Sequence, residues 1–101
     1  MQNQITFARP DASRILFYAE AQHLTIICAW SVLINRATIL EYLRTVDADP
    51  NAGFFTTSEG GVALAHGAAR ITFSEEEFTA IRKFVEHVYR PNETVFWLAI
   101  V

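Results

Sequence analysis

The chain has 101 residues, with 8 basic and 11 acidic side chains, a net charge of −3 and 51% apolar residues. This length and composition are typical of one domain that buries a core without help from a metal or a disulfide framework. Cys28 is the lone cysteine, which excludes an internal disulfide and with it the class of disulfide-stapled secreted domains.

The charge and the apolar pattern also narrow the range of partners. A negative balance argues against nucleic acid, because such binding depends on clustered Lys and Arg that neutralise phosphates. The basic residues are scattered, and where Arg82 and Lys83 adjoin, Glu86 lies within helical reach of both. The first ten residues lack the features of a signal peptide, and residues 24–34, the longest early apolar run, are too short to cross a bilayer. We therefore expect a cytoplasmic protein without membrane contact.

The N-terminal segment predicts a short strand. Residues 5–8 alternate between apolar and other side chains, and Pro10 and Asp11 then favour a turn. No repeat, low-complexity tract or linker interrupts the sequence after this turn. Residues 1–101 are therefore expected to form a single domain.

Residues 12–46 allow two interpretations. Residues 19–22 favour a helix, whereas residues 25–30 carry the β-branched and aromatic side chains of a strand. One continuous helix across this segment would be far longer than usual and would lack an internal cap. We expect a break near His23 or near Asn35, and the pattern does not choose between them.

The middle of the chain predicts one helix and three strands. Apolar side chains recur at three- and four-residue steps over residues 38–46, with Glu41 and Arg44 on another face, as in an amphipathic helix. The Pro- and Gly-containing segment that follows ends this helix. Residues 54–57, 62–65 and 70–73 then read as strands of an antiparallel meander, because Gly-centred turns separate them.

The last part of the chain predicts a helix and a final strand. Ser74 and Glu77 have the spacing of a capping box, so a helix begins at Glu75, and Pro91 marks its expected end. Residues 95–101 are consecutive apolar residues, which suits a strand covered on both faces. Such a strand is expected in the centre of the sheet or at an interface with a second copy, because an open edge of this kind would pair with another chain.

These elements predict an α+β fold. One small antiparallel sheet would combine the N-terminal segment, the meander of residues 54–73 and the final strand. Two or three helices, including those over residues 38–46 and 75–90, would pack on one face of that sheet.

One segment partly matches a calcium-binding loop. Asp47, Asp49 and Asn51 have the one-three-five spacing of oxygen ligands, with Gly53 and Glu59 behind them. Both Gly53 and Glu59 stand one place too late for that loop, and a predicted strand follows instead of a helix. We therefore interpret the segment as a helix-to-strand turn whose carboxylates accept backbone N–H groups, and we predict no metal and no cofactor.

No catalytic constellation emerges from the remaining reactive residues. His23 and Cys28 are five residues apart, which puts them on different faces of either a helix or a strand. Cys28 also lies in the most apolar run and is expected to be a structural cysteine. His66 and His87 have no carboxylate or thiol nearby in the sequence at ligand spacing.

The aromatic and acidic residues suggest a surface for a partner. Thirteen aromatic side chains are many for a chain of this size, so some of them, Phe54, Phe55 or Trp97, are candidates for an interface. Glu75 and Glu76 are candidates for docking a basic partner. An aromatic-rich core and a solvated helix start are the plainer explanations of the same residues.

The function predicted from these features is protein binding without catalysis. A small inhibitor, immunity or antitoxin-like protein of bacterial or phage origin would fit, with another protein as its partner and a homodimer as its expected form. The alternative is a homo-oligomeric small-ligand-binding or enzymatic domain with a pocket between subunits. That pocket would use His66, His23, Glu59 and Tyr42.

Overall fold

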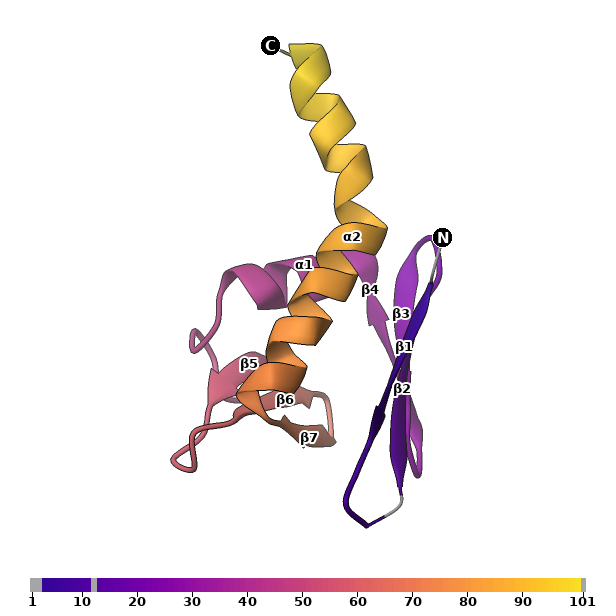
Figure 1. Cartoon of the computed structure of the whole chain (residues 1–101). Helices are drawn as coiled ribbons and strands as arrows, with labels where there is room; N and C mark the ends of the chain where they lie inside the picture. The colour runs from indigo at the N-terminus through magenta and orange to yellow at the C-terminus, as the bar shows by residue number, and fades with distance from the viewer. Residues whose placement is uncertain (1–2, 12, 101) are drawn as a thin grey trace.

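The described residues form two antiparallel sheets and two helices (Figure 1). The structure is a computed structural model that describes residues 3–11 and 13–100, and the side chains as far as residue 89. The elements are β1 (Gln4–Ala8), β2 (Arg14–Ala19), β3 (His23–Ile27), β4 (Ser31–Asn35), α1 (Arg36–Arg44), β5 (Gly53–Thr56), β6 (Val62–His66), β7 (Ala69–Phe73) and α2 (Glu75–Ile100). The α+β class predicted from the sequence is confirmed.

The first sheet is a meander in the order β1-β2-β3-β4. Successive side chains of a strand point to opposite faces, so each strand contributes every second residue to the core. Phe17 on β2 lies opposite Ile26 on β3, and both are fully buried. Leu24 lies opposite Ile34 on β4, and this pair is also fully buried. One face of the first sheet is therefore buried in the core. The residues that alternate with the buried ones along each strand form the opposite, outer face.

The second sheet, in the order β5-β6-β7, is the meander predicted from residues 54–73. Leu64 on the central strand lies between Phe54 and Ile71, and all three are buried. Gly60 and Gly67 lie in the two connecting turns with φ of +90° and +60°, a region that favours glycine. The Gly-centred turns thus set the strand boundaries here.

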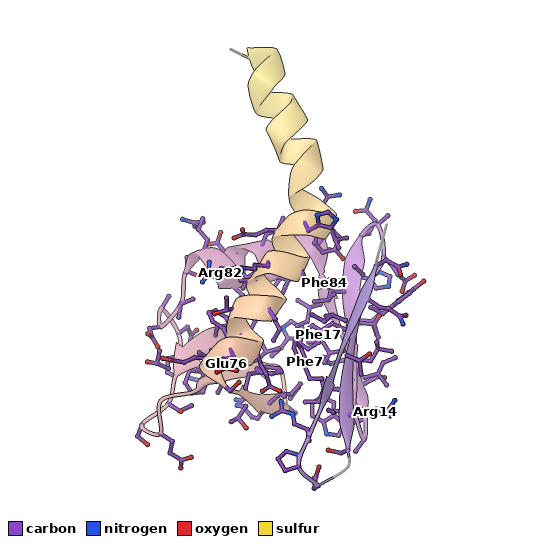
Figure 2. All side chains as sticks on the ribbon, viewed as in Figure 1. Phe7, Arg14, Phe17, Glu76, Arg82 and Phe84 are labelled. Carbon is purple, nitrogen blue, oxygen red and sulfur yellow. The ribbon has the colours of Figure 1, made fainter. Side chains whose placement is uncertain are left out.

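The first turns of α2 lie between the two sheets, and α1 crosses from the end of β4 towards β5 (Figure 1). α2 contacts β1 and β7, and α1 contacts α2, β4 and β5. Phe17 of the first sheet reaches Phe73 of the second, with ring centroids 5.7 Å apart. Figure 2 shows Phe7, Phe17 and Phe84 directed into the same space between the first sheet and α2. The expected single sheet is thus divided into two, because the chain leaves the first sheet through α1.

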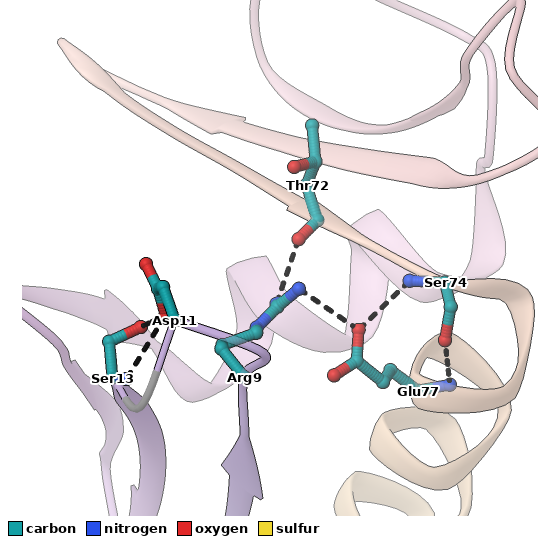
Figure 3. Close-up of polar contacts among 6 residues, drawn as sticks. All are labelled: Arg9, Asp11, Ser13, Thr72, Ser74 and Glu77. Atoms are coloured by element: carbon teal, nitrogen blue, oxygen red, sulfur yellow. Dashed lines mark hydrogen bonds and ion pairs between the residues drawn. The ribbon is translucent and has the colours of Figure 1, made fainter.

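Arg9 joins the end of the first sheet to the second sheet and to α2 (Figure 3). Its Nη2 donates to the carbonyl oxygen of Thr72 at 2.8 Å, and its Nη1 lies 3.3 Å from Oε1 of Glu77. The same Glu77 oxygen accepts from the backbone N–H of Ser74 at 2.9 Å, and the Ser74 hydroxyl accepts from the Glu77 N–H. The predicted capping box is therefore confirmed. It also fixes the Glu77 carboxylate in the position where it pairs with Arg9.

The ambiguous segment, residues 12–46, contains three strands before its helix. The helical preference of residues 19–22 was misleading, because these residues end β2 and form the turn into β3. Breaks occur at both expected places, and Asn35 is the N-cap of α1, where its side chain accepts from the Ala37 N–H at 2.8 Å. Cross-strand pairing thus overrode local helix propensity.

The prediction that α2 ends at Pro91 and that a strand follows was wrong. α2 continues to Ile100, and Figure 1 shows its last turns running beyond both sheets. A proline removes one hydrogen bond from a helix and costs about 3 kcal/mol in its interior. Extending an existing helix still avoids the cost of nucleating a new element after a chain reversal. The apolar run therefore neither reaches the centre of a sheet nor forms a strand within the described residues.

The contact between Phe17 and the rest of the core predicts a large loss of stability on truncation. Phe17→Ala is expected to lower the free energy of unfolding by about 3–5 kcal/mol, because the ring is fully buried. Thr6→Ala on the exposed face of β1 should change it by less than about 0.5 kcal/mol. Urea denaturation of both variants checks the assignment of the two faces, and equal losses would contradict it.

Candidate protein-binding site

Exposed apolar side chains lie along the β3–β4 hairpin of the first sheet. Ile27, Trp30 and Leu33 are 41%, 43% and 56% exposed, and they are the large hydrophobic residues that the described chain leaves exposed. Ile27 ends β3, Leu33 is the middle residue of β4, and Trp30 lies in the turn between the two strands. We call these three residues the hairpin patch. Exposed apolar groups gathered in this way mark interaction sites more often than scattered ones do.

The strand register extends the hairpin patch onto β2. Leu16 on β2 lies directly opposite Ile27. On the other side, Ile27 pairs with Ser31, so Leu33 is the diagonal neighbour of Ile27. The outward-facing residues of β3 and β4 include no Asp, Glu, Lys or Arg. Arg14, at the start of β2, points to the same outer side in Figure 2. The β3–β4 hairpin itself is thus uncharged, and a cation lies on the neighbouring strand.

β4 is also an edge strand with outward-pointing backbone groups. The Cys28 N–H donates to the Trp30 carbonyl and the Arg36 N–H to the Gln22 carbonyl, both at 2.8 Å. Bonded pairs alternate in an antiparallel ladder, so between these two bonds the even-numbered residues of β4 face β3. The N–H and C=O groups of Ser31 and Leu33 and the N–H of Asn35 therefore point away from β3. Within the described chain β4 is hydrogen-bonded to β3 as the last strand of its sheet.

The partner residues predicted from the sequence lie elsewhere. Phe54 is fully buried with its ring 4.9 Å from that of Phe78, so it is inaccessible to a partner in this fold. Phe55 is half-buried on β5, and Glu75 and Glu76 are exposed in the first turn of α2. The Trp97 side chain is outside the described part of the chain. None of the described members of this set belongs to the hairpin patch.

Two of the four predicted ligand-binding residues meet. The Tyr42 hydroxyl lies 2.8 Å from Nδ1 of His66, and both side chains are half-buried. Burial raises the pKa of Tyr42 above its usual value of 10.0, and the Asp49 carboxylate adds to the rise. His23 instead lies at the start of β3, with Nε2 3.1 Å from the Glu20 carboxylate. This arrangement holds a neutral phenol beside an imidazole, without a carboxylate hydrogen-bonded to either ring in the described contacts.

Glu59 lies with the acidic start of α2. It lines an open hollow of about 680 Å³ together with Glu75 and Glu76, and Arg9 borders the same hollow. The sequence had placed Glu59 in the ligand set and the two other glutamates in the partner set. The fold brings these three carboxylates near one another and separates Glu59 from Tyr42 and His66.

The aspartates of the calcium-like segment are engaged in turns. One Asp47 carboxylate oxygen accepts from the Thr56 N–H at 2.7 Å, and Asp49 accepts from the Asn51 N–H at 2.8 Å. Asp47 itself has a φ of +67°, as aspartate tolerates in a tight turn. Among the side chains that the structure describes, no group of three His, Cys, Asp or Glu could hold a metal ion.

The lone cysteine and the remaining histidine take no part in these groups. Cys28 is half-buried just after β3, and His23 begins the same strand, so the two side chains lie at its opposite ends. His87 is exposed on α2.

No protein-family model, curated protein or solved structure matches this chain. No residue role is therefore carried over from a relative, and each role depends on geometry and chemistry. As far as residue 100, neither helix combines the length and the apolar character that a membrane span requires.

The sequence missed two features of the surface. In residues 24–34 the exposed Ile27 and Leu33 stand at odd positions, and the buried Leu24 and Ile26 stand at even ones. Odd and even positions are both apolar, so the sequence did not distinguish the exposed face from the buried one. The second feature is a hollow of about 880 Å³ between α1 and α2. Arg36, Arg44 and Arg82 border it.

The arginines of the second hollow are held by the protein itself. Arg36 donates to the Tyr89 carbonyl at 3.0 Å and lies over the Tyr89 ring. Arg44 pairs with Glu41, and Arg82 lies over the Phe78 ring. Each of these three arginines thus already contacts a group of the same chain, so the hairpin patch is the stronger candidate site.

The burial of the Tyr42 hydroxyl predicts an alkaline loss of stability. The raised folded pKa of Tyr42 means that the folded chain keeps its proton at a pH where the unfolded chain releases it. The free energy of unfolding should therefore fall as the pH rises above about 10. The Tyr42→Phe variant should show a smaller decrease in the free energy of unfolding at alkaline pH than the wild type. Urea denaturation at neutral and alkaline pH measures this difference.

Tyr89 provides a separate comparison for the alkaline measurement. Its hydroxyl donates to the carbonyls of Glu20 and His23, and burial also raises its pKa. Tyr89→Phe should remove its own part of the alkaline fall. A Tyr42→Phe variant with the same pH dependence as the wild type would contradict the burial of the Tyr42 hydroxyl.

Proposed function

We propose that the protein is a non-catalytic protein-binding module that contacts another polypeptide through the hairpin patch. The observation that carries this proposal is the exposure of Ile27, Trp30 and Leu33 together on one uncharged hairpin. Aromatic and aliphatic side chains without nearby charge are typical of the centre of an interface.

The edge of β4 suggests how the partner binds. An extended segment can add to an exposed sheet edge, where main-chain hydrogen bonds supply affinity and alternate side chains supply specificity. Leu33 combines outward backbone groups with a 56% exposed side chain. A partner strand beside β4 would form hydrogen bonds with the outward backbone groups of Leu33 and would cover its side chain.

A module of this kind acts by occupying a surface of its partner. This agrees with the role of a small inhibitor, immunity or antitoxin-like protein of bacterial or phage origin, which we include in the proposal. The proposed setting is the cytoplasm, where a lone thiol such as Cys28 stays reduced.

The ligand-binding alternative is favoured by the hydrogen bond between Tyr42 and His66. A small polar molecule could bind beside this pair in a homo-oligomer. We prefer protein binding because Glu59 and His23, the other members of that set, lie at separate places on the fold.

Site-specific photo-cross-linking tests the proposed function. A photoreactive phenylalanine analogue at position 33 is expected to attach to a second polypeptide in an extract of the native source. The same analogue at position 6 is the matched control, because Thr6 is exposed on the other edge strand. Denaturing electrophoresis and mass spectrometry detect the adduct. No adduct at position 33, or equal yields at the two positions, would contradict the proposal.

A further inference from the structure

We propose that the partner at the hairpin patch is a second copy of this chain, paired antiparallel through β4 about a two-fold axis at Leu33. This inference rests on the proposed function and names the partner of the same surface. The two first sheets would join into one continuous sheet of eight strands.

The backbone of β4 has the pattern that this pairing needs. Ser31 and Leu33 direct their N–H and C=O groups away from β3, and Asn35 directs its N–H away, as follows from the flanking bonds Cys28 N–H to Trp30 and Arg36 N–H to Gln22. With Leu33 on the axis, each Leu33 lies opposite its own copy, and each Ser31 lies opposite Asn35. The two Leu33 residues can therefore exchange two hydrogen bonds, and each Asn35 N–H can donate to the Ser31 carbonyl oxygen of the other copy. The Asn35 carbonyl oxygen, at the N-cap, accepts within α1 instead.

The side chains are self-complementary in the same register. On the outer face two Leu33 side chains meet, and they remove each other's exposed surface from water. On the inner face, half-buried Val32 lies opposite Ile34, which continues the apolar layer across the axis.

The polar ends of β4 also match. The Asn35 side-chain oxygen Oδ1 accepts from the Ala37 N–H at 2.8 Å, so the side-chain Nδ2 is the group that can donate to the Ser31 hydroxyl of the other copy. Hydrogen-bonded polar pairs of this kind stabilise cross-strand contacts.

Charge favours a second copy at this edge. Two chains that each carry −3 repel one another, so they associate at least cost where neither presents a charge. β4 has no charged side chain, so two copies can approach at this edge without bringing like charges together.

The other edge of the first sheet differs. The outward residues of β1 are Gln4, Thr6 and Ala8, which offer no large apolar side chain. Arg9 and Pro10 follow directly, and Arg9 is held by Thr72 and Glu77. A proline and a charge at the end of an edge strand hinder pairing. The two edges thus provide an internal comparison.

Charge substitutions at position 33 test the inference. Wild-type protein is expected to have twice the chain mass of 11.4 kDa in sedimentation equilibrium. L33K and L33E should each be monomeric, because like charges directly opposite one another destabilise a strand pair. An equimolar mixture of the two variants should regain the double mass, since opposite charges then meet on the axis. T6K, on the β1 edge, should remain dimeric.

The outcomes separate this inference from the proposed function. A monomeric wild type, dimeric L33K and L33E, or a mixture that stays monomeric would each overturn self-pairing through Leu33. A wild type that is monomeric but cross-links at position 33 to a different polypeptide would overturn self-pairing and support the proposed function. A monomer without any cross-linked product would overturn both.

Discussion

The burial of one face of the first sheet is the constraint on which the rest of the structure depends. Phe17, Leu24 and Ile26 are fully buried on that face, and Phe17 reaches Phe73 of the second sheet with ring centroids 5.7 Å apart. Because strand side chains alternate, a register that buries these residues must turn Ile27 and Leu33 outward. The hairpin patch is therefore a consequence of the core, and slipping the register to hide it would expose the core instead.

The helices and the Arg9 contacts leave the β4 edge open. α1 begins directly after β4 at the Asn35 cap, which takes the chain away before another strand can pair there. Arg9 links the first sheet to Thr72 and Glu77 at the start of α2 (Figure 3). These contacts hold the first sheet against the second sheet and α2. β4 therefore stays in place at the edge, where a further strand can pair with it.

Local patterns with a single interpretation were predictable from the sequence. The capping box of Ser74 and Glu77 and the Gly-separated meander are confirmed because each rests on nearby residues alone. The strand over residues 5–8 was also predicted and corresponds to β1. The segment of β2, β3 and β4 allowed a helix as well as strands, since pairing partners distant in sequence override local propensity. The prediction that Pro91 ends α2 was wrong, because a proline weakens a long helix without necessarily ending it.

The candidate site was less predictable than the fold. Which apolar residues become exposed depends on what covers each sheet face, and the composition of residues 24–34 holds no information about that cover. Tyr42 and His66 were named from the sequence and do meet, but their contact depends on how α1 packs against the second sheet.

Intermolecular NMR contacts in a mixture of isotope-labelled and unlabelled chains test the central claim most directly. In the proposed register Val32 of one copy and Ile34 of the other form a non-hydrogen-bonded pair, whose Cα atoms approach to about 4.5 Å. We predict an isotope-filtered cross-peak between their α-protons. A dimer that shows intermolecular contacts only at other surfaces, or a chain that shows none, would contradict the account.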